Sequence, residues 1–248
     1  MRLLMLMTVV LGAVLAMGAG ESPAKSVVLE AVDDAYVVTD VSSQEDPQGL
    51  RAQNFGKLQF VRVWYASQLQ AQERVVSIGL VQFDLKPLEG RDVKSATLQL
   101  YADRVDIAQS PRMVDVSLVQ AAWAEADVTF TKRPAWSPEA ISTGAVFGAN
   151  VWYSWDVTQS VIQQTPKGTT SYVLGLRTIE QRGEEQAVFA SKESGRNAPR
   201  LIVTYAPEAE STPAWVWIAA IAGGVVVAFG GGILITRRTR SPKKTTTA

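Results

Sequence analysis

Residues 80–101 of the 248-residue chain, LVQFDLKPLEGRDVKSATLQLY, decide the fold class. Apolar and polar residues alternate in 81–85, and after a connection that contains Pro87 and Gly90 they alternate again in 96–101. A period of two predicts strands with one buried face. Strands of this kind hide that face by packing against a second layer of strands, so we predict an all-β, antiparallel β-sandwich.

The sequence on both sides of this stretch continues as short extended runs separated by turn residues. No amphipathic helical pattern of useful length interrupts them before residue 206, although a short helical turn capped by Asp156 or Thr158 is expected near 156–162. The other expected strands are 27–32, 35–40, 58–65, 114–119, 151–157, 172–178, 187–190 and 201–205.

The composition excludes several classes of function. Residues 25–206 hold 18 basic and 21 acidic side chains, a net charge of −3, which argues against binding to nucleic acid. The chain has no cysteine and no histidine. Disulfides, thiolate metal sites, Ser-His-Asp relays and HExxH zinc sites are therefore excluded, and we expect neither a metal nor a cofactor.

The amino terminus has the pattern of a secretory signal. In residues 1–20, Arg2 precedes a run of apolar residues that ends in small residues suited to signal peptidase. The alternative is an uncleaved anchor helix. With either interpretation the residues that follow leave the cytoplasm.

The carboxyl terminus has the pattern of a membrane anchor. After a polar linker at 206–213, residues 214–236 carry no charge. These 23 residues would form a helix of about 34 Å, enough to cross a bilayer core of about 30 Å. The basic segment 237–248 is expected in the cytoplasm, which predicts a single-pass type I protein of the cell membrane with an extracellular domain.

Small residues recur every four positions in the predicted span, at Ala220, Gly224, Ala228 and Gly232. Such a ridge lets two helices approach closely, which suggests a homodimer formed through the span. The alternative is that a span rich in glycine and alanine produces this spacing by chance.

A set of short motifs occurs in a specific order along residues 27–205. They are DAYV at 34–37, NFG at 54–56, LVQFDL at 80–85, VKSATLQLY at 93–101, WAE at 123–125, VTF at 128–130, RP at 133–134, Trp152, DVT at 156–158, FASKE at 189–193 and PRLIVTY at 199–205. With these motifs the domain resembles the DNRLRE domain, also called carbohydrate-binding module family 96.

The resemblance implies a jelly-roll-like β-sandwich that is extracellular and binds polysaccharide without cleaving it. Characterised binding members of the family are associated with acidic polysaccharide, notably alginate. Gln82 stands where arginine is common in the family, and Phe130 replaces a usual tryptophan. These departures leave the expected fold unchanged and leave the ligand open.

Two kinds of glycan would need different side chains. An acidic glycan needs guanidinium or ammonium groups, for which Arg62 and Arg74 are the candidates, whereas a neutral sugar needs an aromatic platform such as Trp64, Tyr101 or Trp136. We predict these five residues as the carbohydrate-binding site. The alternative is that they serve sandwich packing and rim charge.

Other candidate residues have simpler structural explanations. Trp123, Trp152 and Trp155 are expected in the core or at corners. The pair Glu184-Glu185 is expected in a solvated loop, and no enzymatic activity is predicted. Five carboxylates could hold a structural calcium ion, and turn capping is the simpler explanation for them: Asp33, Asp34, Asp84, Asp156 and Glu193.

A second function remains open, that of a structural adhesion or protein-interaction spacer without sugar binding. The two functions differ in one observable feature. A glycan-binding domain should present a contiguous strip of aromatic and arginine side chains on one sheet, and a spacer should not.

Overall fold

The two alternating runs form strands β4 (Glu73–Asp84) and β5 (Val93–Asp106) in the computed structural model. Val81, Phe83, Leu98 and Leu100 are fully buried, as their alternation with polar residues predicts. Burying one such side chain contributes about 1.5–3 kcal/mol to stability. The two strands do not pair with each other, and each is instead a branch point of the sheet.

The structure describes residues 23–40, 49–68, 73–106, 111–177 and 183–207. The remaining elements are β1 (Lys25–Glu30), β2 (Asp33–Asp40), η1 (Leu50–Ala52), β3 (Phe60–Gln68), η2 (Lys86–Leu88), β6 (Arg112–Leu118), β7 (Ser142–Val146), β8 (Val151–Asp156), α1 (Thr158–Gln164), η3 (Thr165–Lys167), β9 (Thr169–Leu176), β10 (Gly183–Ala190), η4 (Lys192–Ser194) and β11 (Arg200–Tyr205).

All strand pairs are antiparallel, which confirms the predicted class. Strand β4 pairs with β3 through 73–77 and with β9 through 79–84, while β2 pairs with 75–82. Strand β5 likewise changes partner, from β11 to β10, and also pairs with β8. Because both strands change partner midway, hydrogen bonds connect all the strands into one sheet that curls around the core as a half-barrel.

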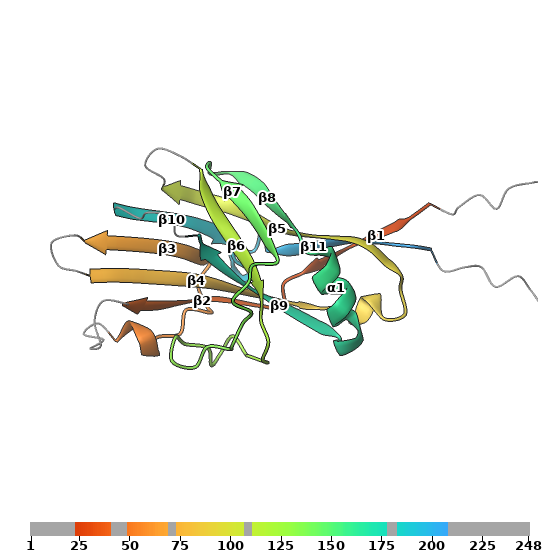
Figure 1. Ribbon diagram of the computed structural model, residues 1–248, viewed down its shortest axis with the longest axis horizontal. Coiled ribbons are helices and arrows are strands. Elements are labelled where there is room, and N and C mark those ends of the chain that lie inside the picture. The colour runs from red at the N-terminus through yellow and green to blue at the C-terminus, as the bar shows by residue number, and fades with distance from the viewer. Residues whose placement is uncertain (1–22, 41–48, 69–72, 107–110, 178–182, 208–248) are drawn as a thin grey trace, which may run out of the picture. The chain divides into compact units, whose positions relative to one another are not determined.

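The curl places strands in two layers. Strands β10, β3, β4 and β2 lie side by side, and β6, β7 and β8 cross in front of them (Figure 1). The largest buried side chains, among them Phe83, Trp155, Tyr172 and Phe189, belong to the main core cluster of this fold.

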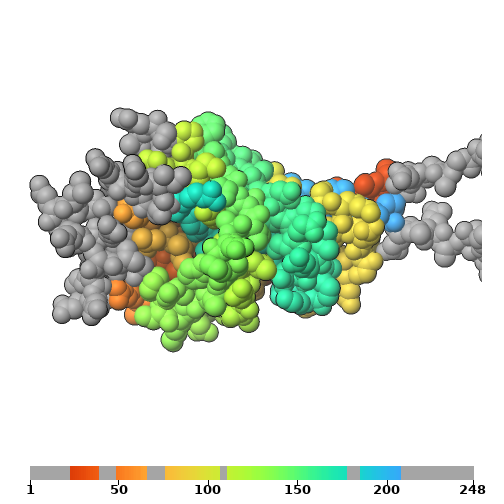
Figure 2. All heavy atoms as spheres, viewed as in Figure 1, coloured from red at the N-terminus to blue at the C-terminus, as the bar shows by residue number. Residues whose placement is uncertain are grey.

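A second, smaller core lies under the segment that follows β6. Val119 and Val128 of this segment pack against Ala35, Val37 and Leu80 from β2 and β4. The segment therefore covers a sheet face that would otherwise be exposed, and its green residues form part of the front surface in Figure 2. We call residues 119–136 the cover segment.

The expected helical turn is helix α1, which begins at Thr158. Asp156 accepts a hydrogen bond of 2.9 Å from the Thr158 N–H, and bonds from Thr158 lower the pKa of Asp156. Strand β7 was not among the expected strands.

The predicted signal peptide at 1–20, the predicted span at 214–236 and the basic segment at 237–248 lie outside the described residues. Within the described ranges, no helix has the length and apolarity needed to cross a membrane.

Candidate functional site

Strand β3 carries two of the predicted site residues on its outer face. Val61 and Val63 are fully buried, whereas Arg62 and Trp64 alternate with them and are only partly buried. Arg62 pairs with Val188 of β10, and Val188 pairs with Arg104 of β5. Because directly paired residues share a face, Arg62 and Arg104 lie on the same side of the sheet, separated by one strand.

A β-bulge aims Arg104 at this face. Val188 pairs with Arg104, but the next residue of β10, Phe189, pairs with Ala102, so Asp103 is the extra residue. A bulge shifts the alternation of side chains by one position. Arg104 therefore shares the outer face with Tyr101, three residues earlier, although strict alternation would place it on the opposite face.

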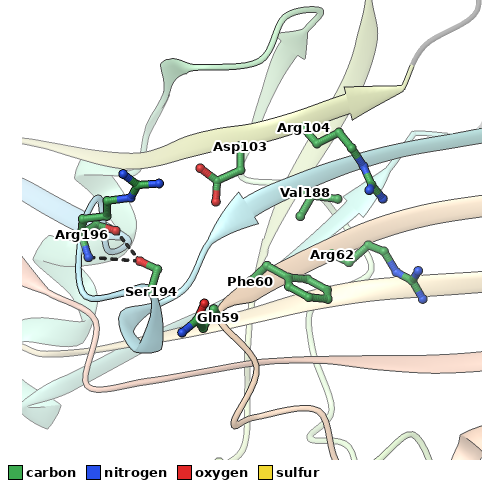
Figure 3. A pocket seen from close by; sticks show the side chains of 8 residues that line it. All are labelled: Gln59, Phe60, Arg62, Asp103, Arg104, Val188, Ser194 and Arg196. Carbon is green, nitrogen blue, oxygen red and sulfur yellow. Dashed lines mark hydrogen bonds between the residues drawn. The ribbon is translucent and has the colours of Figure 1, made fainter.

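These residues surround a groove of about 360 Å³. We call it the arginine groove. In Figure 3, Arg62 and Arg104 lie toward one end and Arg196 toward the other, with Asp103 between them. Three arginines and one aspartate give the lining a formal charge of +2. The complete lining is Gln59, Phe60, Arg62, Asp103, Arg104, Val188, Ser194 and Arg196.

Aromatic rings support the Arg62 guanidinium. Its Cζ atom lies 4.4 Å from the centre of the Trp64 ring and 5.3 Å from that of Tyr36. Tyr36 in turn stacks on Phe55 and Phe60, with ring centres 4.6 and 5.7 Å apart. Burial raises the pKa of Tyr36, and the positive charge of Arg62 partly offsets that rise. These aromatic rings hold the Arg62 side chain at the groove.

The outer face continues along β5 beyond the groove. Tyr101 pairs with Trp152 of β8, and their rings meet edge to face at 5.4 Å. The Arg200 guanidinium lies 3.8 Å from the centre of the Trp152 ring and donates a hydrogen bond of 2.9 Å to Gln99 Oε1. Arginine and aromatic side chains thus extend from β3 across β5 to β8 and β11. We call this set, groove included, the outer strip.

The family model of carbohydrate-binding module family 96 matches residues 25–205. The chain belongs to carbohydrate-binding module family 96. The match includes every strand of the structure and all residues of the outer strip. A search of curated proteins finds no match.

The structure places three of the five predicted site residues of this family 96 module on the outer face, and it brings two of them, Arg62 and Trp64, into contact. Arg62 lines the arginine groove, Trp64 supports it, and Tyr101 lies farther along the outer strip. Arg74 pairs with Ser67 through the backbone, and its side chain lies outside the described part. Trp136 belongs to the cover segment, where it packs on the second core and lies 5.6 Å from the Arg133 guanidinium.

Sequence reasoning missed Phe60, Asp103, Arg104 and Arg196 of the groove. Phe60 was detectable, because it shares the alternation that selected Arg62 and Trp64. The bulge concealed Arg104, since alternation from Tyr101 assigns it to the buried face. Arg196 lies on a turn next to Gly195, whose φ of 69° is left-handed, and no strand pattern locates such a residue.

The tryptophans differ from one another. Trp155 is buried as expected and donates a hydrogen bond of 3.1 Å to the Val114 carbonyl. Trp123 packs, partly buried, on the second core. Trp152 corrects our expectation of a core position, because it lies on the outer face beneath Arg200. Its neighbours in β8 explain this, since Tyr153 and Trp155 point inward and place Trp152 on the opposite side.

Three of the five candidate calcium ligands accept hydrogen bonds from the protein. Asp33 accepts from the Gln82 amide, Asp84 from the Lys86 N–H, and Asp156 from the Thr158 N–H. Within the described ranges, no cluster of three acidic, histidine or cysteine side chains has an arrangement that could hold a metal ion. Asp34 and Glu193 form a different kind of site, described below.

The expectation of a solvated loop at Glu184-Glu185 was wrong. Both residues belong to β10, and Glu185 is only 3% exposed. Its carboxylate forms an ion pair with Arg112 of β6. The pair neutralises a charge that would otherwise be costly to bury between strands of the two layers.

Proposed function

We propose that this family 96 module binds polysaccharide without cleaving it, through the outer strip, and that its preferred ligands carry carboxylates. The observation that supports this proposal is the arginine groove, in which Arg62, Arg104 and Arg196 surround about 360 Å³. Planar guanidinium groups match carboxylates with two parallel hydrogen bonds. A groove lined by three of them suits an acidic chain better than a neutral one.

The apolar part of the strip suits a sugar ring. Phe60 and Val188 line the groove beside the arginines, and Trp152 and Tyr101 extend the same face. Aromatic rings provide a flat apolar surface on which a sugar ring can pack, and the polar side chains beside them can bond to its hydroxyl groups. A strip of arginine and aromatic side chains on one face is the feature expected of a glycan-binding module rather than of a spacer, and it supports this proposal.

The groove favours binding over catalysis. Glycoside hydrolysis ordinarily uses two carboxyl groups on either side of the scissile bond. Among the described residues that line the groove, Asp103 supplies one carboxylate and the other charged groups are arginines. Membership of a carbohydrate-binding module family supports the same conclusion.

The module would act outside the cytoplasm. The signal-like residues 1–20 and the uncharged residues 214–236 support a type I membrane anchor, with the module facing acidic polysaccharide at the cell surface or wall. Dimerisation through the small-residue ridge of that span remains part of this proposal.

Binding can be tested with the full-length protein in mild detergent, by affinity electrophoresis in alginate, polygalacturonate and a neutral xylan. We expect retardation in the two uronate gels that weakens as salt rises from about 50 to about 200 mM, because exposed charges are screened. Arg104→Ala and Arg196→Ala should each reduce the retardation. Arg177→Ala is the matched control, because it removes the same charge from a guanidinium that pairs with Asp115 outside the groove.

Three outcomes would change the proposal. Equal losses in the groove variants and Arg177→Ala would mean that net charge alone causes retention. Retention in xylan that does not respond to salt would indicate that the aromatic residues of the strip, Tyr101 and Trp152, form the binding site instead of the arginine groove. Folded protein that no glycan retards would support the adhesion or interaction spacer instead.

A further inference from the structure

Four segments that are distant in sequence meet at a buried polar cluster close to the groove. Asp34 at the start of β2 is 1% exposed, and around it lie Glu125 of the cover segment and Lys192 and Glu193 of η4. We call these four residues the Asp34 cluster. The fourth segment contains Asn54, which donates hydrogen bonds to the backbone carbonyls of Glu125 and Val128.

One ammonium group faces three carboxylates in this cluster. Lys192 Nζ lies 2.8 Å from Glu125 Oε2 and also forms an ion pair with Glu193. Asp34 Oδ2 accepts a hydrogen bond of 2.7 Å from the Lys192 backbone N–H. With all three acids ionised, the cluster would hold an uncompensated negative charge in a buried place, which is costly.

Two oxygen atoms of the cluster are buried without a hydrogen-bond partner, Asp34 Oδ1 and Glu193 Oε2. A proton on the Asp34 carboxyl removes one of the negative charges and makes that group a donor as well as an acceptor. Burial, followed by the charges of Glu193 and Glu125, raises the pKa of Asp34 to about 7, against the lowering effect of the Lys192 hydrogen bond.

The segment that carries Arg196 is anchored at both ends, and the Asp34 cluster holds the first of them. The segment begins at Lys192, bonded to Asp34, and ends at Pro199, whose carbonyl accepts a hydrogen bond of 2.9 Å from the Ala31 N–H. Both anchors belong to the start of β2 or the residues just before it. Between them the turn places Ser194 and Arg196 in the groove lining. A change at Asp34 therefore reaches the groove through a short, doubly anchored turn.

We propose that the Asp34 cluster is a proton-dependent latch that positions Arg196. A proton on Asp34 keeps the 192–199 segment against the groove, and loss of that proton loosens the segment and weakens binding of carboxylated glycan. The effect on binding rests on the proposed function, whereas the latch itself does not.

The chain is well suited to reveal such a latch. It has no histidine and no cysteine, the side chains that ordinarily titrate near neutral pH. Guanidinium groups and the carboxylates of uronate polymers keep their charge between about pH 6 and about pH 8.5. A change of affinity in that window therefore has to arise elsewhere in the complex.

The decisive variant is Asp34→Asn in the full-length protein. Asparagine keeps the shape of aspartate, its carbonyl can accept from the Lys192 N–H, and it carries no charge, so it imitates the protonated acid. We measure alginate affinity by calorimetry at fixed ionic strength. The wild type should lose affinity at least about fivefold between pH 6 and pH 8.5, as expected for coupling of ordinary size. Asp34→Asn should keep the wild-type affinity of the lower pH throughout.

Asp33→Asn is the matched control. Asp33 is the preceding residue of β2 and bonds to Gln82 rather than to the cluster, so this variant should retain the wild-type pH dependence. Glu193→Gln gives a second test should Asp34→Asn fold poorly. It removes one of the two negative charges that add to the effect of burial on the Asp34 pKa, so the midpoint of the pH dependence should move to lower pH. A wild type without pH dependence, or an Asp34→Asn variant that follows it, would overturn the latch.

Amide hydrogen exchange separates failure of the latch from failure of the proposed function, because it needs no ligand. At about pH 8.5 the amides of residues 194–196 should exchange faster in the wild type than in Asp34→Asn, and at about pH 6 the two proteins should agree. The intrinsic chemical exchange rate of an amide depends on pH, so the two proteins are compared at the same pH. Altered exchange without alginate binding would refute the glycan proposal alone. Binding with identical exchange in the two proteins would refute the latch alone.

Discussion

The indole of Trp64 lies beneath the Arg62 guanidinium, with 4.4 Å between the ring centre and Cζ. Arg62 lines the arginine groove and Trp64 does not, so we expect the tryptophan to affect a bound glycan through the arginine. Trp64→Ala should weaken uronate binding about fivefold, because a cation–π contact of this kind is worth about 1 kcal/mol. Calorimetry on Trp64→Ala, Arg62→Ala and the double variant checks this. Additive losses would mean that the two residues act independently.

Trp152 should matter for long ligands and not for short ones. It lies on the outer strip beside Tyr101, beyond the groove lining, where a ligand must extend along β5 to reach it. Trp152→Ala should lower affinity for a uronate hexasaccharide about fivefold and leave disaccharide affinity unchanged, since stacked aromatic surface contributes about 1 kcal/mol. Phe147→Ala is the control, because Phe147 is 68% exposed on the turn between β7 and β8. Equal losses for both ligand lengths would place Trp152 at the groove itself.

Gly144 should resist substitution because Trp155 occupies the space beside it. A methyl group on Gly144 would lie 2.6 Å from Trp155 Nε1, and that indole is buried and bonded to Val114. Gly144→Ala should therefore lower the free energy of unfolding by about 1–3 kcal/mol, the usual cost of overpacking. Gly175→Ala in β9 should change it by less than about 0.5 kcal/mol, because nothing lies within 4 Å of the added methyl group. Urea unfolding measures both, and equal effects would contradict this account.

Alternation alone predicted the β class and part of the site. The pattern around Val61 and Val63 placed Arg62 and Trp64 on the outer face, and the structure agrees. It failed at Arg104, because the extra residue Asp103 reverses the alternation, and nothing local in the sequence marks that bulge. A period of two identifies a face only while the strand stays regular.

Contacts between distant segments could not be predicted from one sequence. Asp34 bonds to Glu125 and Lys192, which are 91 and 158 residues away along the chain. Their motifs were visible separately, as DAYV, WAE and FASKE, but no local rule states that they converge. The partner exchange of β4 and β5, which curls the sheet, brings them together.

Asp34 should also make stability depend on pH in an unusual direction. Its pKa rises from an ordinary 3.8 to about 7 in the folded protein, so the folded state holds this proton more tightly than the unfolded state does. The stabilisation is complete below about pH 4 and is lost as the pH rises through about 7, for a total of about 4 kcal/mol. Residue 34 cannot titrate in Asp34→Asn, so the free energy of unfolding of this variant should rise relative to that of the wild type as the pH increases through about 7.

Urea unfolding of the wild type, Asp34→Asn and Asp33→Asn at about pH 5 and about pH 8 measures this difference directly. Other carboxylates titrate in all three proteins and cancel in the comparison. Asp33→Asn should follow the wild type, because Asp33 bonds to Gln82 outside the cluster. If the difference in free energy of unfolding between Asp34→Asn and the wild type is the same at both pH values, Asp34 stays ionised at both. In that case Lys192, rather than a proton on Asp34, compensates the buried charge.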